Sequence, residues 1–448
     1  MSTDPPSRAE LYRIIERLVA ENTALRTEVA RLTARGEELA AELAVLRAGG
    51  AAAGRGRVPD RAPRGERPKQ PRAKRTAQFA RPRGLASVRV EHALDACPDC
   101  GGTLRGGSVK RHREVIEVAL PPAVVTDHVL LERLCPHCNR RCVPTLTAAD
   151  GVVGQHRFGP TLLTLITTLH ELGRMPVRLI HEQLATIFGV RVSLGAIAAA
   201  LRAVASRGAT QVAAIRDTVR ISPVVHADET VWWQDGQGRT LWVTSTPTAR
   251  YFEIGRRTAA QIDGILGADF AGLLVSDFYA AYHHLGTHQR CWAHILRELR
   301  ELVAAHPADP TLARWTQRLS RIYHAARDAP GTTAPTRRAI RSRLERRVRD
   351  LCQPHVAAAV PQRKLSARLI KHLHELFSFV TEPGVPSTNN QAERDLRPLV
   401  IARKIWGGTR SEQGSIDAAR RFTLFRTWRA QGLNPFAECR KLLLSPQF

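Results

Sequence analysis

Leucine recurs every seven residues near the start of the chain. Six leucines fall in strict register: Leu11, Leu18, Leu25, Leu32, Leu39 and Leu46. With leucine at d, the a positions include Ile15, Val29 and Asn22, a combination that favours a parallel two-stranded coiled coil with fixed register. The pattern predicts a leucine-zipper-like coiled coil over 8–47, and hence a homodimer or higher oligomer. The alternative, one amphipathic helix packing on its own chain, fits the strict register less well.

Residues 48–90 break this periodicity. The segment is rich in Gly, Pro, Ala and Arg, and residues 55–83 hold eleven Lys or Arg against two acids. Such a composition cannot bury a core, so we expect a basic disordered linker. It is either a solvated spacer or an arm that contacts phosphates, and the two interpretations are compatible.

Apolar residues at helical spacing return over 151–215. The stretches LIHEQLATIFGV and SLGAIAAALRAVA are separated by a turn at Gly189, and Ser193 is suited to cap the second helix. We predict a helical, helix-turn-helix-like DNA-binding domain here. An ordinary helical bundle would give the same pattern.

Strand patterns dominate the next segment. Antiparallel strands are predicted at ISPVVHAD, in the two runs that flank a hairpin turn at 234–238, and at YFEIG. Two further strands, AGLLVSD and QRCWAH, are predicted downstream, and each follows a helix. Together these elements predict a mixed α/β sheet. Helical patterns follow, so the prediction is an α/β domain over 216–448 with an all-helical insertion at about 296–380.

Composition adds a preferred partner. The chain has 448 residues, enough for several domains, with 67 Lys or Arg against 41 Asp or Glu and a formal net charge of +26. This excess excludes an ordinary metabolic enzyme surface and favours a polyanion, above all nucleic acid. There is neither a long uncharged apolar run nor an apolar leader, so we expect no membrane association and a cytoplasmic location.

Two C-x-x-C pairs mark residues 91–150 as a zinc-binding domain. Cys97 and Cys100 form the first pair, and Cys135 and Cys138 follow after 34 residues. Four thiolates complete a closed tetrahedral site, so we predict one structural Zn²⁺ per chain. A redox dithiol is the alternative, and the presence of two pairs argues against it.

Acidic residues follow two predicted strands. Asp228 ends SPVVHAD and Asp277 ends AGLLVSD, so neighbouring strands would bring both carboxylates to one end of the sheet. Repulsion between them would be relieved by Mg²⁺ or Mn²⁺. Glu393 is the best third acid, although three residues after Asn390 it could equally be a capping-box carboxylate. Glu229 competes with Asp228, but it should point to the opposite face of the strand.

Several motifs together carry a family resemblance. They are HADET at 226–230, SDFYAAY at 276–282, CWAH at 291–294, NNQAERDLRP at 389–398 and RKIW at 403–406. In order and spacing the chain resembles bacterial transposases of the insertion-sequence 66 family over about 150–445. The resemblance implies a ribonuclease-H-like catalytic core whose Asp-Asp-Glu (DDE) triad maps onto Asp228, Asp277 and Glu393.

The same resemblance implies an activity and partners. A DDE-type transposase would use two Mg²⁺ or Mn²⁺ ions to cleave DNA at the ends of a bacterial insertion sequence and to transfer the strands. Its partners would be double-stranded DNA of the element ends and of the target, with accessory proteins of the same element, in the nucleoid. The alternative functions are a non-catalytic zinc-containing DNA-binding regulator and a nuclease without strand transfer.

Basic residues beside the third acid are candidate DNA ligands. Arg394 and Arg397 share its helix, and Arg403 and Lys404 lie further along. A solvated helix face is the alternative for them. Cys291 and His294 have the spacing of metal ligands, but no partner pair is evident in the sequence, so the favoured interpretation is a structural role.

Overall fold

The computed structural model describes residues 89–106, 108–109, 123–147, 150–153, 157–329 and 333–445. The predicted coiled coil over 8–47 and residues 48–88 of the predicted linker lie outside these ranges. The chain divides into two compact units, residues 1–116 and 117–448, which are described separately.

In the first unit, the chain makes a tight turn around Cys97 and Cys100. The amide of Cys97 donates to the carbonyl of Gly102 at 2.9 Å, and the amide of Gly101 donates back to Cys97 at 2.8 Å. Gly101 has a φ of 72°, a conformation that glycine adopts without a steric cost. An antiparallel bridge between Ala96 and Thr103 closes the turn.

The second unit begins with a similar turn in a short hairpin. The strands are β1 (Arg133–Leu134) and β2 (Arg141–Cys142). The amide of Cys135 donates to the carbonyl of Arg140 at 2.8 Å, and Asn139 has a φ of 55°. Both C-x-x-C segments therefore end in a left-handed residue directly after the second cysteine.

Within the described residues, four helices precede the main sheet. They are α2 (Pro160–Glu171), α3 (Val177–Phe188), α4 (Leu194–Arg207) and α5 (Ala209–Arg220). As predicted, Gly189 ends α3 in the left-handed conformation, and the Ser193 hydroxyl caps α4 by accepting from the amide of Ala196 at 3.2 Å. One hydrophobic cluster runs from these helices into the sheet and includes Ile197 and Val225.

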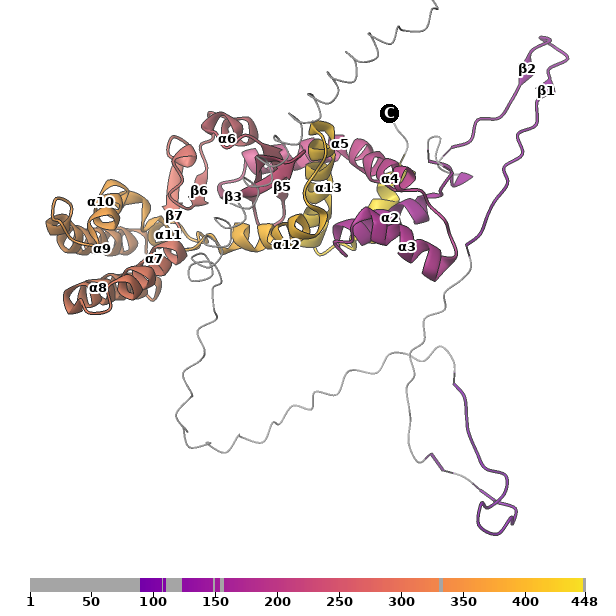
Figure 1. Ribbon diagram of the computed structural model, residues 1–448, viewed down its shortest axis with the longest axis horizontal. Coiled ribbons are helices and arrows are strands. Elements are labelled where there is room, and N and C mark those ends of the chain that lie inside the picture. The colour runs from indigo at the N-terminus through magenta and orange to yellow at the C-terminus, as the bar shows by residue number, and fades with distance from the viewer. Residues whose placement is uncertain are drawn as a thin grey trace, which may run out of the picture. The chain divides into compact units, whose positions relative to one another are not determined.

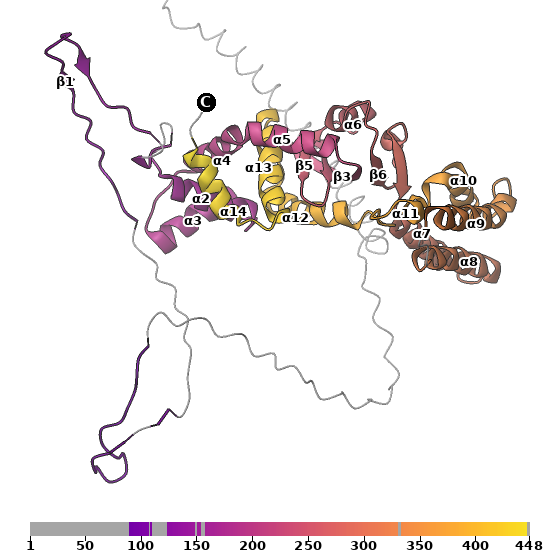
Figure 2. The ribbon, with the colours of Figure 1, turned by 180° about the vertical axis from the view of Figure 1, so that it is seen from behind.

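A five-stranded mixed sheet forms the centre of the unit (Figures 1 and 2). Its strands are β3 (Val224–Gln234), β4 (Gln237–Ser245), β5 (Arg250–Gly255), β6 (Leu273–Ser276) and β7 (Thr287–Arg290). Their order is β5-β4-β3-β6-β7, with β3, β4 and β5 antiparallel and β3, β6 and β7 parallel. The β3–β4 turn is Asp235-Gly236, and both residues have positive φ, as a two-residue hairpin requires.

Helices cover both faces of the sheet. On one face, Trp232 and Phe252 pack against Leu396 and Phe422, which lie on α12 (Asn390–Trp406) and α13 (Glu412–Ala430). The opposite face packs against α5 and α6 (Ala259–Leu266). The last helix, α14 (Pro435–Leu444), packs against α2. Alternate residues of β3 therefore face different layers, which separates Asp228 from Glu229.

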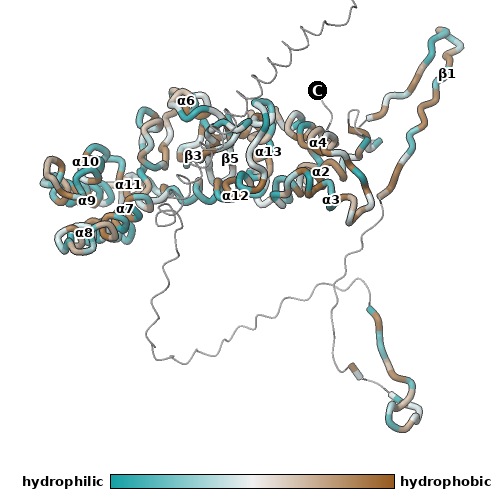
Figure 3. The backbone as a smooth tube through the Cα atoms, in the orientation of Figure 1, coloured by the Kyte–Doolittle hydropathy of each residue, from teal (hydrophilic) through white to brown (hydrophobic). Residues whose placement is uncertain are grey.

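A helical region lies between β7 and α12 in the sequence. It comprises α7 (Trp292–Ala305), α8 (Pro310–Arg327), α9 (Ala334–Cys352), α10 (Arg363–Lys371) and α11 (Ser378–Thr381), with short 3-10 turns at Gln353–His355 and Leu373–Glu375. These helices have their own hydrophobic core. Hydrophilic and hydrophobic segments mix along α8 and α9, as in amphipathic helices that cover a small core (Figure 3).

Two local predictions around β7 were wrong. The predicted strand QRCWAH ends at Arg290, and α7 begins at Trp292 with Cys291 as its N-cap. The expected helix after AGLLVSD is only a 3-10 turn, Ala280–Tyr282. Tertiary contacts override the strand preference of this aromatic-containing segment, because the amide of Trp292 donates to the Ser387 carbonyl at 3.0 Å.

Candidate functional site

Two parallel strands carry the first two candidate acids. His226 of β3 pairs with Val275 of β6, and Asp228 and Asp277 each follow two residues later. The parallel register brings Asp228, the fifth residue of β3, level with Asp277, which directly follows the end of β6. The predicted neighbourhood of the two aspartates is present, but the prediction that Asp228 ends its strand was wrong, because β3 continues to Gln234 and its residues from His226 onwards pair with β4.

Burial and crowded charge dominate the environment of Asp228. Desolvation, with like charges on Glu229, Asp277 and Glu393, raises the pKa of Asp228 to about 8, although Oδ1 accepts from the amide of Glu229 at 2.9 Å. Both partner acids of the predicted triad thus act electrostatically on Asp228. A buried group of acids of this kind favours either a proton or a cation.

Replacing Asp228 by Asn should stabilise the metal-free protein at high pH. The folded-state pKa of about 8 lies above the ordinary value near 3.9, so the wild-type protein loses stability as the pH rises from about 4 to about 8. An amide has no such loss. In the presence of a chelator, the wild-type protein and Asp228→Asn should therefore have the same melting temperature near pH 4. Towards pH 9 the melting temperature of Asp228→Asn should become the higher of the two. A gap that narrows with rising pH would contradict this.

Asn389 fixes the start of α12 and with it the third acid. The Asn389 side-chain amide donates to the carbonyl of Ala227 at 2.7 Å, and its oxygen lies 3.0 Å from the His226 ring. Its backbone amide donates to Cys291 Sγ at 3.1 Å. These contacts pin the N-terminus of α12 against β3, so that Glu393 lies one turn into the helix.

Glu393 is not a capping-box residue. The N-cap is Asn389 rather than Asn390, and its side chain makes no capping hydrogen bond because it is used against β3. Glu393 Oε1 is buried and has no hydrogen-bond partner. The carboxylate is therefore available for chemistry, and the capping alternative fails.

Glu229 belongs to the opposite face of β3, as strand alternation predicts. Its carboxylate accepts from the Tyr282 hydroxyl at 2.6 Å and from Arg257 at 2.8 Å. Burial raises its pKa, whereas these two donors lower it. Glu229 thus has a structural network of its own, which makes it a suitable control for Asp228.

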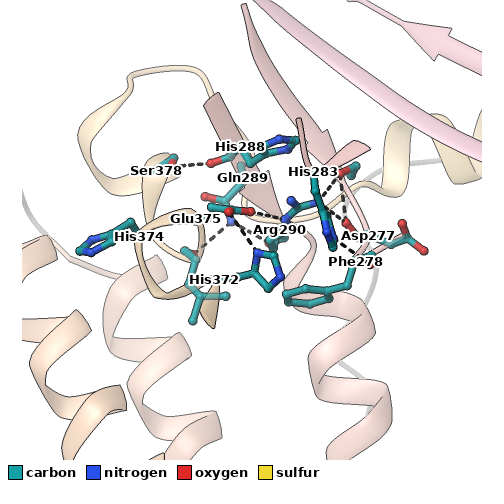
Figure 4. A network of polar contacts seen from close by, with 12 residues as sticks. Asp277, Phe278, His283, His288, Gln289, Arg290, His372, His374, Glu375 and Ser378 are labelled. Carbon is teal, nitrogen blue, oxygen red and sulfur yellow. Dashed lines mark hydrogen bonds and ion pairs between the residues drawn. The ribbon is translucent and has the colours of Figure 1, made fainter. Parts of the chain in front are cut away.

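A buried arginine at the end of the neighbouring strand β7 supports the backbone of Asp277 (Figure 4). Arg290 donates to the Asp277 carbonyl at 2.8 Å and to the Ser276 hydroxyl at 3.1 Å, and its Nε pairs with Glu375. The ring of His372 lies 3.0 Å from the second Glu375 oxygen. The helical region is therefore tied to the backbone of a candidate acid. Sequence reasoning missed this network because its members lie 85 residues apart.

The four basic candidates fall into two groups. Arg394, Arg397 and Lys404 have exposed side chains on α12. Arg403 instead donates to Thr230 Oγ1 at 3.3 Å and to the carbonyl of Val231. Arg403 therefore helps to hold α12 on β3, which is a structural task.

In each C-x-x-C turn, the sulfur of the first cysteine accepts hydrogen bonds from backbone amides. Hydrogen bonds from the amides of Asp99 and Cys100 lower the pKa of Cys97. The amides of Cys138 and His137 likewise lower the pKa of Cys135. Donors around a sulfur stabilise its thiolate, the form that binds metals. Each turn by itself is thus suited to supply metal ligands.

Comparison with known proteins assigns the family. Residues 155–416 match the family model described as Transposase IS66 family, a span that contains Asp228, Asp277 and Glu393. The chain belongs to this family. Because the match starts after Cys138, the membership of this IS66-family chain rests on its helical and α/β region.

Two proteins of Sinorhizobium fredii (strain NBRC 101917 / NGR234) are similar to this IS66-family chain. The uncharacterized protein y4jO is 30% identical over 175 residues, covering 38% of this chain and 51% of y4jO. The uncharacterized protein y4hP is 23% identical over 234 residues, covering 46% of this chain and 42% of y4hP. The chain spans about half the length of these curated relatives. Among the described residues, no helix combines the length and apolarity needed to cross a membrane.

Proposed function

We propose that the chain is a DDE-type transposase that cleaves DNA at the ends of an insertion sequence and joins the freed strands to target DNA. The observation that carries this proposal is the parallel pairing of β3 with β6, which brings Asp228 and Asp277 side by side, with Glu393 of α12 close enough to add to the charge that raises the pKa of Asp228. The sheet order, with three antiparallel strands followed by two parallel ones, supports a ribonuclease-H-like core. The net charge of +26 supports DNA as the substrate.

The three acids fit a pair of hard divalent cations. Without a counter-charge Asp228 holds its proton, because its pKa is raised to about 8, and one Glu393 oxygen has no hydrogen-bond partner. Oxygen ligands of this kind suit Mg²⁺ or Mn²⁺. Bound there, two such ions would activate an attacking water or DNA 3′-hydroxyl and stabilise the leaving oxygen.

The residues of the chain then have separate tasks. Asp228 within β3 and Asp277 just after β6 supply two carboxylates from neighbouring parallel strands. Asn389 anchors α12 against β3 and so keeps Glu393 near them. Arg394 and Arg397 are exposed one turn apart on α12 and are positioned to bind phosphates that flank the reacting bond. Arg403 is better explained as a structural contact, and Lys404 remains a weaker phosphate ligand.

A strand-joining assay tests this function. Labelled DNA ending in the terminal sequence of the element that encodes the chain is incubated with plasmid, protein and Mg²⁺ or Mn²⁺. Covalent joining of the labelled 3′ end to plasmid is expected. Cleavage without joining would identify a nuclease, and binding without either reaction would identify a DNA-binding regulator.

The two C-x-x-C turns are proposed to share one structural zinc ion. Their matching backbone geometry and donor-rich sulfurs support this interpretation. Cys97→Ser should therefore lower the zinc content by about one ion per chain and weaken recognition of the DNA ends, with the α/β region still folded. Elemental analysis and circular dichroism measure both effects. A zinc content equal to that of the wild-type protein would refute this site.

Association through residues 8–47 is proposed from the heptads alone. The full chain should be a dimer or higher oligomer at micromolar concentration. Asn22→Leu should strengthen association and loosen the control of oligomer size, because the buried amide that selects register is removed. Light scattering coupled to size-exclusion chromatography measures both. A monomeric wild-type chain would exclude the coiled coil.

A further inference from the structure

Three ligand atoms of different chemistry meet where α7 and α12 begin. The sulfur of Cys291, an imidazole nitrogen of His294 and a carboxylate oxygen of Glu393 all lie within 4.8 Å of one another. Within the described part of the chain, this is the only such group of three His, Cys, Asp or Glu side chains. The sequence concealed it, because Glu393 follows the other two by about a hundred residues.

Two of these atoms lack a hydrogen-bond partner. His294 Nδ1 and Glu393 Oε1 are both buried and make no hydrogen bond. They lie 3.7 Å apart, which is too long for a hydrogen bond. Ligand bonds of 2.0–2.2 Å place neighbouring ligands of a tetrahedral zinc about 3.4 Å apart. The observed separation therefore suits two ligands of one ion better than a direct contact.

The sulfur is arranged as a metal ligand. Cys291 is fully buried and is the N-cap of α7, a helix of 14 residues. Its Sγ accepts from the amide of Asn389 at 3.1 Å, and the amides of Ala293 and His294 also donate to it. Burial raises the pKa of the Cys291 thiol, although these amide donors lower it, so the thiolate forms there only with the charge of a bound cation.

We propose that Cys291, His294 and Glu393 bind one zinc ion. A thiolate and an imidazole favour Zn²⁺ over Mg²⁺, so this site differs in chemistry from a site made of carboxylates alone. Three protein ligands leave a fourth position for water or for a phosphate oxygen. A carboxylate can use its two oxygens separately, so zinc at Oε1 would orient Glu393 and leave Oε2 for other ligands. Only this orienting role rests on the proposed function.

Zinc content of the full-length protein tests the site. Wild-type protein, Cys291→Ser and His294→Gln are purified without chelators, checked by circular dichroism and analysed for zinc. Each variant should carry about one zinc per chain fewer than the wild type. His294 is partly exposed, so His294→Gln keeps the test decisive if Cys291→Ser fails to fold. Cys352→Ser is the matched control, because Cys352 is equally buried but lies in the core of the helical region. It should retain the wild-type content.

Cobalt provides a second readout. With Co²⁺ in place of zinc, His294→Gln should lose part of the visible absorption, and Cys97→Ser should lose a different part. Equal zinc content and equal cobalt spectra in wild type and His294→Gln would overturn the site and leave only an ion pair. The outcome is independent of strand joining: a protein without joining activity can still lose this zinc, and an active one can lack it.

Discussion

Asp228→Asn and Asp277→Asn are each expected to lower strand joining by about 10³-fold while DNA binding persists. Each change keeps the side-chain size and removes one carboxylate from the set of Asp228 and its neighbouring acids. Removing a single group that stabilises a transition state typically costs 10²–10³-fold. Affinity for DNA depends mainly on Lys and Arg contacts with phosphates, so it should be unchanged or slightly higher. Gel-based joining assays at equal DNA occupancy measure the effect.

Glu229→Gln is the matched control for these variants. Its carboxylate accepts from Arg257 through one oxygen and from Tyr282 through the other. In glutamine the amide oxygen can still accept from Arg257, while the amide nitrogen donates to the Tyr282 hydroxyl, which accepts as well as donates. It should therefore keep substantial joining activity. Activity should require Mg²⁺ or Mn²⁺ and should not be supported by Ca²⁺, which holds its ligands in a looser geometry. An inactive Glu229→Gln beside an active Asp228→Asn would reverse the assignment of the first acid.

Arg290→Met should cause the largest loss of stability. The guanidinium is fully buried, pairs with Glu375 and donates to Ser276 and Asp277, so its removal leaves several polar groups without a partner. Breaking a buried ion pair costs roughly 3 kcal/mol, equivalent to a fall in melting temperature of about 4 °C in a unit that spans residues 117–448. Differential scanning calorimetry gives the value. Joining should also fall, because the backbone of Asp277 loses its support.

Arg327→Met is the control for this change. Arg327 pairs with Asp328 on the surface, where both side chains are more than half exposed. Exposed pairs contribute about 0–1 kcal/mol, so the melting temperature should hardly change. If the two variants melt at the same temperature, the Arg290 network has no special role in stability.

Local signals made part of this fold predictable. The hairpin at Asp235-Gly236 and the cap at Ser193 each depend on residues close together in the sequence, and both are present in the structure. The two aspartates could be placed together because both follow apolar runs typical of parallel strands. Glu393 was harder to place, since its helix is fixed by distant contacts of Asn389 with His226 and Ala227.

The predictions that failed, and the contacts that were missed, share a physical cause. QRCWAH has the composition of a strand, but a turn at Cys291 starts a helix that packs into a different core. The pairing of Arg290 with Glu375 and the approach of Glu393 to His294 join segments tens of residues apart. No periodicity records such contacts, because they arise only when the helical region and the sheet pack together.

Asp228, Asp277 and Glu393 are proposed to form one cation site for DNA chemistry. The most direct test is anomalous scattering from crystals soaked with Mn²⁺, with data collected on both sides of the manganese absorption edge. Manganese is expected to be bound by all three carboxylates in the wild-type protein and to be absent from crystals of Asp228→Asn. Manganese bound at Glu229, or at Asp228 and Asp277 with Glu393 turned away, would contradict it.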